Sequence, residues 1–149
     1  MGVGSLCTHR VITVDRGIDV AAAAGVMRDN HIGYLIVTDA GTGGAAPIGV
    51  LTDRDIVVKV LAKNVDAHSL TVGDVMTPEP LTAAIDDSLG ETLHRMRAMG
   101  VRRVPVVGPR GQITGVLSLD DVIDHLVGQL ADVSGSIHTE QRVERALQT

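Results

Sequence analysis

Two short segments of the chain carry a hydroxyl side chain followed, three positions later, by a carboxylate. Thr52 and Asp55 lie in the first, GVLTDRDI, and Ser118 and Asp121 lie in the second, GVLSLDDV. A hydroxyl at the start of a helix can donate to a phosphate, beside the unpaired N–H groups of the first turn. A carboxylate can accept from both hydroxyls of a ribose diol. The same spacing also describes a capping box that binds only the helix backbone, so both interpretations stay open.

The two segments belong to a longer internal repeat. Residues 31–37, HIGYLIV, align with residues 100–106, GVRRVPV, at an offset of 69, whereas the two segments themselves are 66 residues apart. The offset changes because the first copy has three more residues around its Gly/Ala-rich stretch 39–47, where a surface loop tolerates insertion. Two related units are therefore expected, with the hydroxyl–carboxylate pairs at equivalent positions.

Apolar runs and apolar positions three or four residues apart predict the order strand, helix, strand, strand, helix in each copy. In the second copy, Ser88 and Glu91 have the spacing of a capping box that opens its first helix. Pro78 and Pro80 exclude a continuous helix in the turn-rich linker, residues 64–80. Strands are expected at 11–14, 34–38, 48–52, 104–107 and 112–117, and helices at 20–30, 53–63, from 89 onward, at 120–130 and, outside the repeat, at 140–147.

The repeat predicts an α/β (α+β) fold in which two β-α-β-β-α units pack about a pseudo-twofold axis. We expect the units at 5–66 and 67–131, followed by a tail at 132–149 whose role the sequence does not indicate. A unit of about 55 residues is marginal alone, so the two copies should bury their apolar faces against each other. A cleft between related halves is a common place for a small molecule.

Composition narrows the classes of function. The chain has 149 residues, a net charge of −5 and 1% aromatic residues, with Tyr34 as its single aromatic side chain. Stacking platforms and a basic groove are therefore lacking, which argues against nucleic-acid partners. One cysteine, Cys7, suits a reducing compartment, and no apolar run approaches a membrane span, so a cytoplasmic protein without membrane partners is expected. The histidines lack metal-ligand spacing and no nucleophile motif occurs, so neither an enzyme nor a bound metal or cofactor is expected.

From about residue 5 to residue 131 the chain resembles a tandem pair of CBS domains, named after cystathionine β-synthase. The resemblance depends on the element order, the GVLTDRDI and GVLSLDDV segments, the RRVPVV stretch at 102–107 and the DVMTP stretch at 74–78. It implies a stand-alone Bateman module that binds AMP, ADP or ATP, with S-adenosylmethionine and NAD as further candidates. It also implies a homodimer formed through exposed helices and regulation of an unidentified protein in trans. The alternative is a structural dimerisation module without a ligand.

The resemblance further implies that arginines reach across the cleft to phosphates. Arg102 and Arg103 would serve the Thr52/Asp55 site, and Arg54 would serve the Ser118/Asp121 site. Guanidinium groups suit phosphate geometry, but each of the three could instead be a solvated side chain or pair with Asp53 or Asp120. Because the first copy lacks the arginine pair, we expect the two sites to differ in affinity.

Adenine needs an aliphatic slot and main-chain hydrogen bonds. The candidates are Thr13, Tyr34 and Leu35 in one site, and Thr82, Val104 and Pro105 in the other. The alternative is that these residues belong to ordinary core strands.

Overall fold

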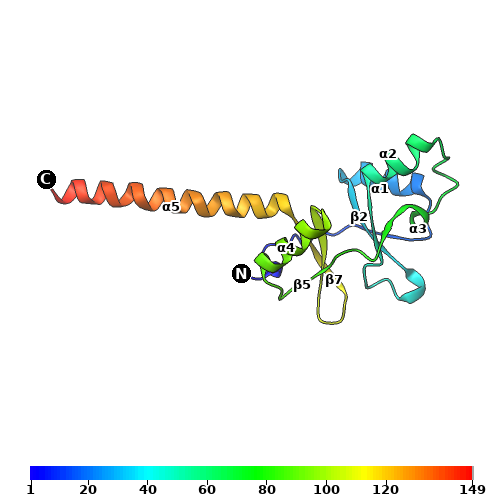
Figure 1. The fold of residues 1–149 in the computed structure, drawn as a ribbon, viewed down its shortest axis with the longest axis horizontal. Coiled ribbons are helices and arrows are strands. Elements are labelled where there is room, and N and C mark those ends of the chain that lie inside the picture. Colours follow the sequence, from blue (N-terminus) through cyan, green and yellow to red (C-terminus); the bar gives the residue numbers. More distant parts are fainter. Residues whose placement is uncertain (149) are drawn as a thin grey trace.

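Two separate β-sheets form the fold, one in each copy of the repeat, and a long helix projects from the second copy (Figure 1). The computed structural model describes residues 1–148, so the last residue of the predicted tail lies outside the described residues. The mixed α/β class is as predicted. The strands are β1 (Thr13–Asp15), β2 (Tyr34–Thr38), β3 (Gly49–Thr52), β4 (Thr77–Pro78), β5 (Ala83–Ala84), β6 (Arg103–Val107) and β7 (Ile113–Ser118).

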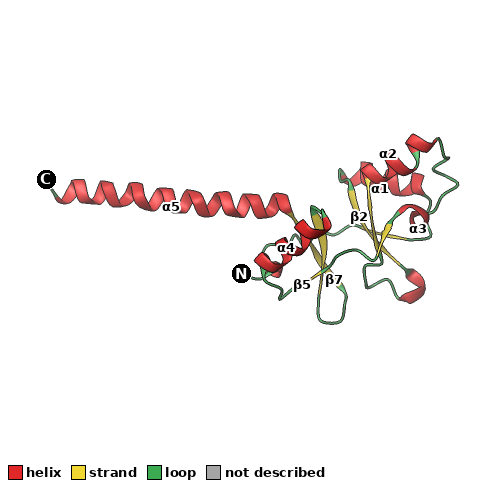
Figure 2. Ribbon diagram, viewed as in Figure 1, coloured by secondary structure: helices red, strands yellow, loops and turns green. Residues whose placement is uncertain are grey.

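Apart from the long projecting helix, the helices lie beside these sheets (Figure 2). The α-helices are α1 (Val20–Asn30), α2 (Asp53–Lys59), α3 (Val72–Val75), α4 (Leu89–Met99) and α5 (Leu119–Leu147), and the 3-10 turns are η1 (Val3–Ser5), η2 (Ala40–Thr42) and η3 (Leu61–Lys63).

The sheets repeat the same pairing. In the first, β1 is parallel to β2 and β2 is antiparallel to β3; in the second, β5 is parallel to β6 and β6 is antiparallel to β7. The register pairs Tyr34 with Thr52 in one sheet and Arg103 with Ser118 in the other. The two predicted hydroxyl residues therefore end equivalent strands, each opposite the first residue of the neighbouring strand.

The first helix of each copy starts and ends through local chemistry. Asp19 caps α1 by accepting from the N–H of Ala22 at 2.7 Å, and Ser88 caps α4 by accepting from Glu91 at 3.2 Å. Both helices then end on a left-handed residue, His31 (φ 54°) after α1 and Gly100 (φ 67°) after α4. Glycine adopts this conformation without strain, whereas histidine does not.

Each hydrophobic core is completed by the chain segment that precedes the other copy. Val3 and Cys7, from the N-terminal segment, pack in the core of the second sheet, whereas Val72 and Val75 of α3 pack in the core of the first. The core contacts thus cross the boundary between residues 66 and 67 that the repeat predicts. This exchange ties the two copies together.

The glycine that opens each repeated segment allows these exchanged segments to approach closely. The N-terminal segment pairs with β7, because Thr8 and Val116 exchange backbone hydrogen bonds of 2.9 Å. A Cβ atom on Gly115 would lie 2.6 Å from the carbonyl oxygen of Thr8, and one on Gly49 would lie 3.1 Å from that of Thr77. A larger side chain would push either segment away from its sheet.

The structure differs from the predicted elements in three places. The helix predicted at 53–63 divides into α2 and η3, because Val57, Val58 and Val60 are β-branched residues of low helix propensity. The helices predicted at 120–130 and 140–147 form one continuous helix, since no proline interrupts the intervening residues. The turn-rich linker contains α3, which a capping box of Thr71 and Asp74 begins.

Candidate functional site

Two cavities are lined by the two hydroxyl–carboxylate pairs. Thr52 and Asp55 line a cavity of about 470 Å³, called here the Thr52 cavity, and Ser118 and Asp121 line a cavity of about 390 Å³, called here the Ser118 cavity. Both volumes lie within the usual range of small-molecule sites. The repeat in the sequence is thus a repeat of pocket-lining chemistry.

The Thr52 pair also forms a complete capping box. The Thr52 hydroxyl accepts from the Asp55 N–H at 3.1 Å, and one Asp55 carboxylate oxygen accepts from the Thr52 N–H at 3.0 Å. The other oxygen lies 3.2 Å from the ammonium group of Lys59. The capping interpretation is therefore present in the structure, on side chains that also face a cavity.

The Ser118 pair is arranged differently. The Ser118 hydroxyl accepts from the Asp121 N–H at 3.2 Å and donates to the Asp121 carboxylate at 2.7 Å. In the second copy, the Ser118 hydroxyl proton points at the Asp121 carboxylate. In the first copy, the ammonium group of Lys59 lies beside the Asp55 carboxylate and balances its charge. The two sites therefore present different charge patterns to a ligand.

The backbone around both pairs follows the repeat. The N–H of Asp53 donates to the carbonyl of Gly33 at 3.0 Å, and the N–H of Leu119 donates to the carbonyl of Arg102 at 2.9 Å. Gly33 thus occupies the position that Arg102 has in the second copy. A Cβ atom on Gly33 would meet the carboxylate of Asp53, so a side chain at this position would require the exposed Asp53 side chain to move.

One wall is common to the two cavities. Gly33, Tyr34 and Arg103 line both of them. The Arg103 guanidinium lies 5.8 Å from the centre of the Tyr34 ring, within the range of a cation–π contact, and 3.8 Å from the carboxylate of Asp120. The Tyr34 ring and the Arg103 guanidinium are therefore both available to a ligand in either cavity.

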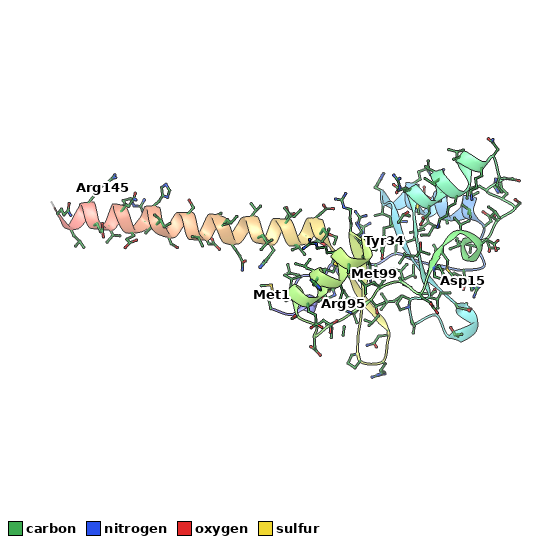
Figure 3. All side chains as sticks on the ribbon, in the orientation of Figure 1. Met1, Asp15, Tyr34, Arg95, Met99 and Arg145 are labelled. Atoms are coloured by element: carbon green, nitrogen blue, oxygen red, sulfur yellow. The ribbon has the colours of Figure 1, made fainter. Side chains whose placement is uncertain are left out.

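Tyr34, on β2, is the single aromatic residue of the chain (Figure 3). Its hydroxyl is buried and has no hydrogen-bond partner among the described residues. Burial raises the pKa of the phenol far above its ordinary value, an effect that the nearby charge of Arg103 partly offsets. The hydroxyl stays protonated at neutral pH and can donate a hydrogen bond.

All three predicted arginines line the Thr52 cavity. Arg102 and Arg103 line it together with Thr52 and Asp55, and both also face Asp120, with the Arg102 nitrogen 3.3 Å from one carboxylate oxygen. The ion-pair alternative is thus also present. Arg54 was predicted to serve the opposite site, but it lines the cavity of its own copy, because the first turn of α2 borders that cavity.

The Ser118 cavity has two cationic or titratable residues that the sequence interpretation missed, Arg10 and His31. Arg10 lies in the irregular stretch before β1, and the residue 69 positions later is Glu79, so the repeat did not reveal it. Aliphatic side chains complete the wall. They are Ile12, Ile32, Ile36 and Val116.

The predicted adenine contacts fall mostly away from the cavities. Leu35 and Val104 are fully buried in the two cores, Pro105 is buried, and Thr13 is exposed on β1. Within the described residues, neither these four nor Thr82 lines the two cavities, whereas Tyr34 lines both. The core-strand alternative thus accounts for the side chains of Leu35 and Val104.

Two further features bear on the class of site. Over residues 1–148, the acidic, histidine and cysteine side chains form no cluster of three that could hold a metal ion. In the same range, no helix combines the length and apolar content needed to cross a lipid bilayer.

Comparison with known families explains the duplicated geometry. The family model of the CBS domain matches residues 3–62 and again residues 72–128. The chain belongs to the CBS domain family. The two matches correspond to the two copies of the repeat, so the two cavities lie in a tandem CBS pair.

Relatives share most of this CBS pair. Hypoxic response protein 1 of Mycobacterium tuberculosis is 35% identical over 128 residues, which cover 85% of this chain and 81% of that protein. An uncharacterized protein of Methanopyrus kandleri, MK0525, is 27% identical over 123 residues. These residues cover 83% of this chain and 61% of that protein, so the chain spans less than two thirds of that relative.

Solved structures agree in fold. The CBS domain pair of protein MJ0100, crystallised with 5'-methylthioadenosine and S-adenosyl-L-methionine, superposes with a TM-score of 0.75 at 24% identity. The match covers 87% of this chain and 98% of that one. At this identity the likeness shows the shared fold.

Proposed function

We propose that this CBS pair binds adenosine-containing nucleotides of the AMP, ADP or ATP type in its two cavities and transmits their binding to a partner protein. The observation that carries the proposal is the duplication itself. A hydroxyl and a carboxylate line each of two repeat-related cavities of nucleotide size, next to arginines. The ligands of the MJ0100 pair, both adenosine derivatives, support this class.

In the Thr52 cavity, the ribose would bind at Asp55 and the phosphates at the arginines. Asp55 is 18% exposed, so it offers the cavity a carboxylate that is already partly desolvated. Arg54, Arg102 and Arg103 are the cations of this cavity. Guanidinium groups bind phosphate through paired hydrogen bonds, so a ligand phosphate would compete with Asp120 for Arg102 and Arg103.

In the Ser118 cavity, the aliphatic wall suits a nucleobase. Ile12, Ile36 and Val116 surround the cavity, and Asp121 offers the carboxylate for the ribose. Arg10 would take the phosphate. With one arginine of its own against two in the Thr52 cavity, beside the common Arg103, this site is expected to bind polyphosphates less tightly.

Arg103 would couple the two sites. One guanidinium cannot hold phosphates in both cavities at full strength, so a ligand in the Thr52 cavity that takes Arg103 weakens the other site. If a ligand draws the Arg103 side chain away from Tyr34, the cation–π contact is lost and the Tyr34 ring, which lines both cavities, becomes available to a ligand. The two binding steps are therefore expected to differ in affinity, and Arg103→Ala to make them independent.

Exposed apolar residues on the helices would form a homodimer interface, through which nucleotide binding would reach the regulated partner. Val57 and Val58 on α2 and Met99 at the end of α4 are 48–63% exposed. They suit the homodimer that the CBS resemblance implies. A ligand shifts such an assembly only if it binds one arrangement more tightly than the other.

The second candidate is an interaction module without a ligand. The complete capping box of Thr52 and Asp55 favours it, because those side chains already have a structural role. A thermal-shift panel of AMP, ADP, ATP, NAD and S-adenosylmethionine separates the two candidates. A nucleotide at 100 times its dissociation constant should add about 2.7 kcal/mol to stability, whereas an unchanged melt at millimolar nucleotide would support the module without a ligand.

A further inference from the structure

Helix α5 projects from the body over most of its length (Figure 1). The helix has 29 residues, which corresponds to a length of about 43 Å. Val122 is buried, but from residue 126 to residue 148 every side chain is exposed. Arg145 lies near the free end, far from the body (Figure 3). We call residues 123–147 the arm.

The arm carries an apolar stripe without a partner in this structure. Ile123, Leu126, Leu130, Val133 and Ile137 follow one another at spacings of three, four, three and four residues, and they are 48–69% exposed. This spacing places them on one face of the helix. The stripe offers on the order of 500 Å² of apolar surface, which is at the upper end for a monomer.

The arm's own residues do not favour an isolated helix. Gly128 and Gly135 lie in its middle, and Val127, Val133 and Thr139 are β-branched. Glycine and β-branched residues have low helix propensity, and helical segments without tertiary contacts are marginal in water. A covered stripe would explain why the helix continues to Leu147.

The charge of α5 decides which class of partner suits the stripe. From Leu119 to Leu147 the helix has six acidic residues and two arginines. A helix that binds an anionic membrane surface needs a basic polar face, which this helix lacks. The stripe therefore suits another protein helix.

We propose that the arm pairs antiparallel with the arm of a second copy of this chain, with Leu130 at the twofold axis. The stripe is symmetric about Leu130 to within one residue, because its other members lie seven and four positions before Leu130 and three and seven positions after it. An antiparallel partner would therefore place Ile123 beside Ile137 and Leu126 near Val133. Two such stripes together reach the roughly 1,000 Å² that a specific interface requires.

Like charges oppose the parallel arrangement. Continuing the same spacing beyond Ile137 leads to Glu140 and Glu144. A parallel pair would bring each of these carboxylates against its own copy in the seam, which is destabilising. The antiparallel pair separates identical carboxylates, although with Leu130 on the axis it sets Glu140 level with the Asp120 position of the other copy, where α5 begins. This inference does not depend on nucleotide binding, because the CBS match ends at residue 128.

Sedimentation velocity on the full chain tests the pairing. Leu130→Asp should weaken self-association by at least about tenfold, because it places a charge in an apolar seam. The matched control is Thr139→Asp, which adds the same charge on the opposite face of α5 and should leave the association constant unchanged. A monomeric wild type, or equal association of wild type and Leu130→Asp, would overturn the proposal.

Disulfide trapping tests the direction, in a Cys7→Ala background that removes the natural thiol. Leu130→Cys should cross-link to its own copy, and the double variant Ile123→Cys/Ile137→Cys should do so as well. Ile137→Cys alone should not, because its antiparallel neighbour is Ile123. Cross-linking of Ile137→Cys alone would show a parallel pair and overturn the proposal, as would binding of the arm to phosphatidylglycerol vesicles in place of self-association.

Discussion

Replacement of Asp55 by alanine separates its two roles. In the capping box, the change removes the hydrogen bond from the Thr52 N–H at 3.0 Å, which costs about 1 kcal/mol of folding stability. It also removes the ion pair with Lys59, whose side chain is 40% exposed, and such a pair contributes at most about 0.5 kcal/mol. We therefore expect Asp55→Ala to lower the free energy of unfolding by about 1–1.5 kcal/mol.

The binding role predicts a separate loss. If the Asp55 carboxylate accepts from the ribose hydroxyls, its removal costs about 1.5–3 kcal/mol of binding free energy, a tenfold to hundredfold rise in the dissociation constant. Isothermal titration calorimetry with AMP measures this loss at a temperature where the variant is fully folded. Asp55→Asn keeps one oxygen acceptor and should show a smaller loss.

Asp74 is the matched control. It closes the same kind of capping box on α3, where its carboxylate accepts from the Thr71 N–H at 2.9 Å, but it lines neither the Thr52 cavity nor the Ser118 cavity. Asp74→Ala should lower stability without changing nucleotide affinity. Equal nucleotide affinity of wild type, Asp55→Ala and Asp74→Ala would refute the ribose role and leave Asp55 as a cap.

Three further predictions concern folding. Two backbone N–H groups hold the pKa of Asp15 below its ordinary value, so its stabilisation is complete above about pH 4 and is lost as the pH falls through the folded pKa. Asp15→Asn should therefore flatten this part of an acid-unfolding curve, and an unchanged curve would contradict the assignment. His31→Gly should stabilise the protein by about 1 kcal/mol in urea unfolding, and Gly100→Ala should destabilise it by a similar amount, because both residues are left-handed; shifts of the same sign would refute this. Gly115→Ala should lower stability by about 1–3 kcal/mol through collision with the N-terminal segment. Gly128→Ala, in open space, should leave the melting temperature of the body unchanged.

Local features were predictable because they depend on neighbours in the chain. The cap at Ser88 and the strand at 34–38 form where the sequence predicts them, since a side chain three positions from a backbone N–H needs no distant partner. The error at α2 was also local: a helix was predicted over residues 53–63, although the β-branched valines in this stretch have low helix propensity and α2 ends at Lys59.

Cavity lining was predictable only in part. The repeat placed Thr52 and Ser118 at equivalent strand ends, and both line cavities. Arg54 lines the cavity of its own copy and not the opposite one, and Arg10 and His31, which line the Ser118 cavity, were not predicted. Which cavity an arginine faces depends on how the two copies pack, and sequence spacing does not report that.

The repeat was enough to predict two related units, each with a hydroxyl–carboxylate pair at the start of a helix. Three other features became visible in the folded chain: which core each segment completes, that Arg103 and Tyr34 line both cavities, and that α5 leaves the body with its apolar stripe exposed. The two groups of features differ in the sequence distance over which they act. Caps and periodicity act over three or four residues, whereas cavity walls join side chains that are tens of residues apart, and their positions follow from the packing of the whole fold.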